Sequence, residues 1–130
     1  MKTILVLEDE PSLMNLLHRV LGRHGYAILE AASPEEAVRQ FNDRGRKIDL
    51  LLADVGLPGI SGVQVALLLR AELPELRVIL TSGYPPNSWS VRDSGFLQRL
   101  GSDSVSVLLK PFVPRTLLDR VSGLLENIAA

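Results

Sequence analysis

Residues 48–54 have the sequence IDLLLAD, a nearly continuous apolar run that ends in a carboxylate. Such a run is typical of a parallel strand buried on both faces, because a strand with one solvated face alternates apolar and polar residues. Runs with the same β-branched or leucine-rich character occur at residues 4–7, 27–29, 78–81 and 105–109. The sequence therefore predicts five buried strands, the third of which covers residues 48–53.

Segments with helical periodicity separate these strands. The first and last carry apolar stripes, formed by Leu13, Leu17, Val20 and Leu21 and by Leu117, Leu118, Val121, Leu124, Leu125 and Ile128. The second helix should begin with Ser33 as N-cap and Pro34 at its first position, and Glu36 should close a capping box. A third helix is expected over residues 61–72, and the last should begin near Pro114.

The fourth helix has the weakest sequence signal. Residues 85–88 (PPNS) are typical of a loop, and Gly95 and Gly101 lower the helical propensity of the segment that follows. We expect a short or irregular helix around residues 90–100, anchored by Trp89 and Phe96.

Strands that alternate with helices predict an α/β domain, with a parallel sheet, right-handed crossovers and helices on both faces. In such sheets, ligands bind at the carboxyl ends of the strands, near the switch in strand order. Polar residues follow four of the predicted strands at that edge, namely Glu8, Asp9, Asp54, Thr81, Ser82 and Lys110. We therefore expect these side chains to lie close together.

Three carboxylates in one place repel one another unless a cation neutralises them. Oxygen ligands without His or Cys suit a hard cation, and Mg²⁺ is the natural choice. A lysine and a hydroxyl beside the acids would complete a site that can hold a phosphoryl group. A carboxylate can itself be the nucleophile and form an aspartyl phosphate, which makes Asp54 a candidate acceptor.

Each of these signals also has a structural explanation. A lone Asp at a strand end is more often a turn-former or a helix cap, and Glu8 and Asp9 could cap the first helix. The dipeptide Lys110-Pro111 could be an ordinary turn. Their joint occurrence at the ends of strands one, three, four and five favours a functional site.

Composition limits the other classes of function. The 130 residues suit a single domain, 1–130, and 46% of them are hydrophobic. A net charge of -1 without a Lys/Arg stripe argues against direct nucleic-acid binding. The absence of cysteine excludes disulfides and thiolate sites. No apolar run could span a bilayer and no signal peptide is evident, so we expect a soluble, cytoplasmic domain without direct membrane contact.

Four motifs resemble one known family over essentially the whole chain: 7–10 (LEDE), 54–62 (DVGLPGISG), 81–84 (TSGY) and 109–112 (LKPF). The family is the receiver domains of two-component response regulators and hybrid histidine kinases. The resemblance implies a flavodoxin-like (βα)5 three-layer sandwich with strand order 2-1-3-4-5. It also implies Mg²⁺-dependent transfer of a phosphoryl group to an aspartate from a histidine kinase or a histidine phosphotransfer protein.

The resemblance assigns Asp54 as the phosphoryl acceptor. Asp9 matches the direct carboxylate ligand of Mg²⁺, and Asp54 and the backbone carbonyl of Gly56 match the other protein ligands. Glu8 matches a second acidic position, often Asp in the family, and would reach the metal through water.

The resemblance also assigns the groups that would hold the phosphoryl oxygens. Ser82, rather than Thr81, matches the switch hydroxyl because a small residue follows it, and Lys110 matches the phosphate-contacting lysine. The bond between Lys110 and Pro111 resembles one that is cis in the family. Phosphorylation would switch the surface of the fourth helix, fifth strand and fifth helix, which a downstream effector or an attached kinase domain would recognise.

Two features depart from the family pattern. The aromatic switch residue lies three positions before the lysine, where this chain has Val107, so the usual aromatic rotation cannot operate unchanged. Residues 83–104 form a longer segment than in compact members, and with the motif at 82–84 this makes the chain most similar to receivers of hybrid kinases.

Three alternative functions fit the sequence less well. A haloacid-dehalogenase-like phosphatase needs a second acid two residues after the nucleophile, and Gly56 occupies that position. A flavodoxin-like cofactor carrier needs a Ser/Thr/Gly-rich phosphate loop after the first strand, where this chain has three acids. A degenerate receiver that serves only as a docking module would not need the intact acids, hydroxyl and lysine. We therefore expect a signalling phosphoacceptor whose only catalysis is its own phosphotransfer and autodephosphorylation.

Overall fold

A computed structural model describes residues 1–45, 47–101 and 103–126. Strands and helices alternate along the chain, as the sequence predicts. The elements are β1 (Thr3–Leu7), α1 (Pro11–Arg23), β2 (Ala27–Ala31), α2 (Pro34–Asp43), β3 (Leu50–Asp54), α3 (Gly62–Glu72), β4 (Arg77–Ser82), a 3₁₀ turn η1 (Pro86–Ser88), α4 (Val91–Leu100), β5 (Val105–Leu109) and α5 (Pro114–Glu126).

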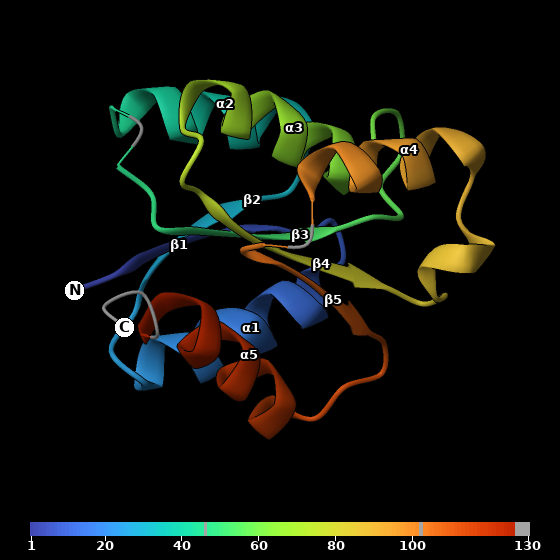
Figure 1. Cartoon of the computed structure of the whole chain (residues 1–130). Helices are drawn as coiled ribbons and strands as arrows, with labels where there is room; N and C mark the ends of the chain where they lie inside the picture. The colour runs from blue at the N-terminus through green and yellow to red at the C-terminus, as the bar shows by residue number, and fades with distance from the viewer. Residues whose placement is uncertain (46, 102, 127–130) are drawn as a thin grey trace.

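The five strands form one parallel sheet in the order β2-β1-β3-β4-β5, which confirms the predicted fold class and strand order. Helices α2, α3 and α4 cover one face of the sheet, and α1 and α5 cover the other (Figure 1). The strand order reverses at β1, whose two neighbours are β2 and β3. The carboxyl ends of β1 and β3 therefore lie side by side at the switch point, where α/β sheets bind ligands.

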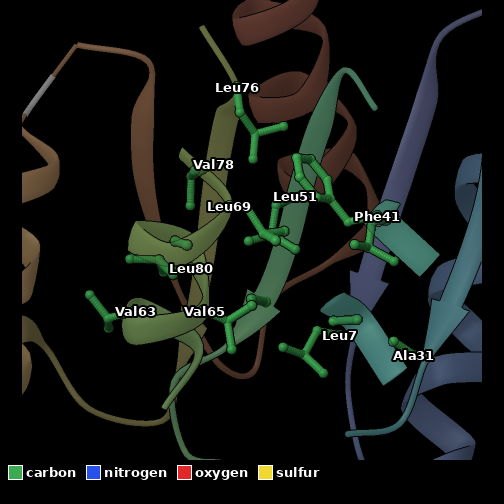
Figure 2. Packing of buried hydrophobic residues seen from close by; sticks show 14 of the residues in the cluster. Leu7, Ala31, Phe41, Leu51, Val63, Val65, Leu69, Leu76, Val78 and Leu80 are labelled. Carbon is green, nitrogen blue, oxygen red and sulfur yellow. The ribbon is translucent and has the colours of Figure 1, made fainter. Parts of the chain in front are cut away.

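Successive side chains of each strand point to opposite faces of the sheet, which divides the core into two layers. Leu51 and Leu80 pack with Phe41 and Leu69 on the face covered by α2, α3 and α4 (Figure 2). Leu52 belongs to the second cluster, on the face covered by α1 and α5. Because both faces of β3 are buried, each of its residues contributes to a core, and full burial of one such leucine contributes about 1.5–3 kcal/mol. This burial explains the continuous apolar run in the sequence.

Several boundaries differ from the predicted ones. Strand β3 begins at Leu50 rather than at residue 48, because Asp49 turns its carboxylate to the backbone N–H of Thr3 at 2.8 Å. In α1 the buried residues are Met14, Leu17 and Leu21, while Leu13 and Val20 are half-buried. Ile128, predicted on the stripe of the last helix, lies outside the described residues.

The predicted cap of α2 is confirmed in part. Ser33 is the N-cap, and its Oγ accepts a hydrogen bond from the backbone N–H of Glu36 at 3.2 Å. The Glu36 carboxylate accepts from the N–H of Ala32 at 3.5 Å, one residue before the donor of a standard capping box. The box is therefore displaced by one residue.

Helix α4 lies where the sequence predicts it and is a short α-helix of ten residues, so of the two expected forms, short or irregular, only the irregular one is wrong. Ser90 caps its start by accepting from the N–H of Asp93 at 3.1 Å, and Gly101, with φ of 83°, ends it. These two ends define the helix despite Gly95, whose helical cost of about 1 kcal/mol is small. Trp89 and Phe96 pack against the core as the predicted anchors. No helix in the described part of the chain is long and apolar enough to cross a membrane.

Candidate functional site

Three carboxylates converge at the carboxyl ends of β1 and β3, as the sequence predicts. Asp54 is the last residue of β3 and is 8% exposed. Glu8 directly follows β1 and is buried, whereas Asp9 is exposed. One oxygen from each of the three carboxylates lies within 4.8 Å of the other two. The side chains that the sequence places at separate strand ends therefore form one acidic cluster.

These acids are not the caps of α1. The N-cap of that helix is Glu10, whose carboxylate accepts from the backbone N–H groups of Ser12 at 3.1 Å and Leu13 at 2.8 Å. Glu8 faces inward, with its Oε2 accepting from the N–H of Glu10 at 3.1 Å. The capping explanation for Glu8 and Asp9 is therefore wrong, because Glu10 fulfils that role.

Lys110 places its ammonium group against the acidic cluster from the end of β5. Its Nζ lies 3.2 Å from Oδ2 of Asp54 and 3.4 Å from Oε1 of Glu8. The backbone N–H of Lys110 donates to the carbonyl of Ser82 at 2.8 Å, which fixes the lysine beside the end of β4. The peptide bond between Lys110 and Pro111 is cis, as the resemblance implied.

The electrostatics of the cluster favour a bound cation. Burial raises the pKa of Glu8, and the charge of Asp54 raises it further, while the N–H of Glu10 and the ammonium group of Lys110 oppose this increase. The one positive charge of Lys110 does not balance the three ionised carboxylates beside it. Mg²⁺ prefers carboxylate oxygens and usually binds through one or two of them while it keeps several waters. Glu8, Asp9 and Asp54 thus fit such an ion in donor type and in proximity.

The loop after β3 shapes the acceptor carboxylate. The backbone N–H of Gly56 donates to Oδ1 of Asp54 at 3.0 Å, so the two oxygens of this carboxylate have different partners. Gly56 is exposed, and its carbonyl remains a predicted metal ligand.

Gly62 is a part of the site that the sequence argument did not single out. It is the first residue of α3, and a Cβ atom there would lie 2.3 Å from the backbone oxygen of Asp54. Only glycine allows the start of α3 to approach the acceptor so closely. The preceding residue, Ser61, caps α3 and donates from Oγ to Asp93 of α4 at 2.8 Å. Gly62 belongs to the motif at 54–62, but its close approach to the backbone of Asp54 is evident only in the folded structure.

Ser82 is buried at the end of β4, and its hydroxyl already has three contacts. Its Oγ donates to the carbonyl of Tyr84 at 2.7 Å and accepts from the N–H of Tyr84 at 3.0 Å. The indole N–H of Trp89 donates to the same oxygen at 3.1 Å. The sequence identified Ser82 as the switch hydroxyl and Trp89 only as a hydrophobic anchor. The hydrogen bond between them was not predicted.

Thr81, the other hydroxyl residue at the end of β4, faces the opposite side of the sheet from Ser82. Thr81 pairs in register with Asp54 and Leu108, while Ser82 pairs with Leu109. Leu80, two residues before Ser82, belongs to the core under α2, α3 and α4, and its register partner on β5 is Val107. Val107 is half-buried in that layer and offers no side-chain hydrogen bond.

A comparison with protein families matches residues 4–122 to the response regulator receiver domain. This chain is a receiver domain of two-component systems. The receiver is 31% identical to the sensor kinase CckA of Brucella abortus over 126 residues, which cover 96% of this chain and 13% of that protein. It is 32% identical to the transcriptional regulatory protein PhoP of Bacillus subtilis, over 97% of this chain and 49% of PhoP. The receiver thus spans half or less of these relatives.

Solved structures agree with this assignment. The CheY-like receiver domain protein from Methanospirillum hungatei has a TM-score of 0.84 at 25% identity, covering 98% of this chain and 95% of that one. The response regulator TrrA from Thermotoga maritima, in complex with Mg²⁺ and beryllofluoride, has a TM-score of 0.78 at 33% identity, covering 96% of this chain and 100% of that one. The flavodoxin-like fold of the receiver is therefore shared with both.

Proposed function

We propose that Asp54 accepts a phosphoryl group from the phosphohistidine of a histidine kinase or a histidine phosphotransfer protein. The observation that carries this proposal is the ammonium group of Lys110, 3.2 Å from the buried Asp54 carboxylate and beside two further acids. The lysine can neutralise charge on a transferred phosphoryl group, and the acids can hold a metal ion next to it. A structural ion pair alone would not need Glu8 and Asp9 in the same cluster.

The transfer forms one bond and breaks another. A carboxylate oxygen of Asp54 bonds to phosphorus, while the bond from phosphorus to the imidazole nitrogen of the donor breaks and leaves its electron pair on that nitrogen. Lys110 holds a phosphoryl oxygen, and the N–H of Gly56 orients the carboxylate through Oδ1. The Ser82 hydroxyl would donate to another phosphoryl oxygen after leaving its present partners. Hydrolysis of the acyl phosphate would return the receiver to its starting state.

Mg²⁺ held by Asp9, Asp54, the Gly56 carbonyl and, through water, Glu8 would supply positive charge to the phosphoryl oxygens during transfer. Support for this ion comes from the oxygen-only cluster and from the beryllofluoride complex of TrrA, which contains Mg²⁺. The acyl phosphate would carry a charge of about -2 at neutral pH, compared with -1 on the free carboxylate, and this change would then alter the surface formed by α4, β5 and α5. A downstream effector or an attached kinase domain would bind that surface.

Phosphorylation by a small acyl phosphate with Mg²⁺ tests the acceptor directly. We expect intact-protein mass spectrometry to show one added phosphoryl group, and Asp54→Asn to abolish it. Asp119→Asn is the matched control, because Asp119 is exposed on α5 and its ion pair within the described residues, with Arg115, is long at 3.7 Å. A phosphoryl group that persists in Asp54→Asn at the level of the control would show that another residue is the acceptor.

A further inference from the structure

The hydroxyl of Ser82 has no free hydrogen-bonding capacity in this structure. A serine hydroxyl can donate one hydrogen bond and accept two. Its donor is used by the carbonyl of Tyr84, and its two acceptor positions are used by the N–H of Tyr84 and the indole N–H of Trp89. To donate to a phosphoryl oxygen on Asp54, the hydroxyl must therefore give up its bond to Tyr84 and turn from the arrangement that Trp89 stabilises.

Trp89 is well placed to oppose this movement. Its Nε1 donates both to Oγ of Ser82 at 3.1 Å and to the carbonyl of Tyr84 at 2.9 Å, which links the two partners. Its ring packs against the core layer under α2, α3 and α4. The indole thus has a fixed body and a single donor directed at the end of β4.

The position of Trp89 connects this donor to α4. Trp89 directly precedes Ser90, the N-cap of α4, whose Oγ accepts from the N–H of Asp93. A displacement of the indole therefore acts on the first turn of α4 through one peptide bond. Val107, the register partner of Leu80 on β5, has no polar side-chain atom with which to detect the Ser82 hydroxyl.

We propose that Trp89 is the positioning residue that restrains Ser82 in the unphosphorylated receiver and transmits its release to the start of α4. This inference rests on the proposed function of Asp54, because the phosphoryl group is what draws the Ser82 hydroxyl away. Loss of the indole N–H should make the hydroxyl easier to recruit. The receiver should then bind a phosphoryl mimic more tightly.

Beryllofluoride with Mg²⁺ is a suitable probe, and bound fluoride can be measured by ¹⁹F NMR independently of tryptophan. Trp89→Phe keeps the ring but removes the donor, and we expect it to tighten beryllofluoride binding about two- to tenfold, the effect of one net hydrogen bond. The same substitution in a Ser82→Ala background should leave the affinity unchanged, because the two effects are coupled. Ser94→Ala is the matched control, since Ser94 bonds the carbonyl of Pro86 nearby without contacting Ser82.

Trp89 is also the only tryptophan in the chain, so its fluorescence reports on itself. In the unmodified receiver, the emission should change along the same titration curve as the bound-fluoride signal, and Ser82→Ala should remove that change. Equal or weaker beryllofluoride binding by Trp89→Phe, or an emission that stays constant at saturation, would overturn the role of Trp89. Absence of bound fluoride in the unmodified receiver, or its persistence in Asp54→Asn, would instead refute the acceptor assignment.

Discussion

Replacement of Gly62 by alanine should destabilise the receiver and displace its acceptor residue. The added Cβ would lie 2.3 Å from the backbone oxygen of Asp54, 2.9 Å from its carbonyl carbon and 3.1 Å from Cβ of Ala53. The first two of these atoms belong to the backbone of β3, so no side-chain rotation can relieve the clash. Either α3 must move outward or the end of β3 must shift.

The size of the effect follows from two opposing contributions. Overpacking of a well-packed core costs about 1–3 kcal/mol. Alanine recovers at most about 1 kcal/mol of helical propensity over glycine. Because the clash is with backbone atoms, the upper part of the overpacking range, about 2–3 kcal/mol, applies. Less about 1 kcal/mol of propensity, the net loss should be about 1–2 kcal/mol, which for 130 residues corresponds to a decrease in Tm of about 4–7 °C. Displacement of Asp54 by a fraction of an ångström should also weaken beryllofluoride binding by up to about tenfold, since about 1 Å can cost about 100-fold in activity.

Thermal unfolding and beryllofluoride titration of Gly62→Ala measure both effects. Gly123→Ala is the control, because Gly123 lies within α5 and nothing is within 4 Å of its added Cβ. The control should gain up to about 1 kcal/mol and bind beryllofluoride normally. If Gly62→Ala matched Gly123→Ala in both measurements, the close packing of α3 on Asp54 would not constrain the site, and the reasoning would be refuted.

Two further predictions concern groups around the site. With Mg²⁺ chelated, the free energy of unfolding should fall as the pH rises from the ordinary pKa of Glu8 to its raised pKa in the folded receiver, because the folded receiver holds the Glu8 proton more tightly. Each unit by which folding raises this pKa corresponds to a loss of about 1.4 kcal/mol. Glu8→Gln should flatten that slope and stabilise the metal-free receiver at neutral pH in urea titrations; an unchanged slope would contradict the raised pKa. Arg70→Lys should cost about 2 kcal/mol in the same assay, because the guanidinium group bonds the carbonyls of Leu76 and Leu100 and the hydroxyl of Ser104. An unchanged urea midpoint would show that solvent satisfies those carbonyls equally well.

The sequence predicted the parts of the site that strand geometry determines. Parallel strands that end at one edge must bring Asp54, Glu8 and Lys110 together, so their convergence followed from the positions of the apolar runs. Chemistry then restricted the use of the cluster, because oxygen ligands without sulfur or imidazole favour a hard cation. These deductions needed no side-chain coordinates.

The remaining features depend on tertiary distances that sequence spacing does not specify. Glu10, rather than Glu8 or Asp9, caps α1, and three adjacent acids gave no indication of which one would turn toward the helix. Helix α4 is short but not irregular, because the caps at Ser90 and Gly101 outweigh one helical glycine. Trp89 and Ser82 are seven positions apart in the sequence, and an indole in the loop and turn between β4 and α4 is equally consistent with a simple hydrophobic anchor.

These contacts give the two ends of α4 different roles. The first turn is bonded to Ser61, which precedes the glycine that packs on the backbone of Asp54. Trp89, next to the N-cap, bonds Ser82, whose hydroxyl is proposed to contact the phosphoryl group. The last turn is held by Arg70, which donates to the carbonyl of Leu100 at 2.8 Å and whose other partners in the described part of the chain, Leu76 and Ser104, lie outside the acidic cluster. Arg70→Lys should therefore lower stability by about 2 kcal/mol without altering beryllofluoride affinity. Trp89→Phe should tighten that affinity and should lower the stability of the unphosphorylated receiver by the same net hydrogen bond, about 0.5–1.5 kcal/mol. A helix fixed at one end and coupled at the other can change orientation in response to Asp54 while the core beneath it stays packed.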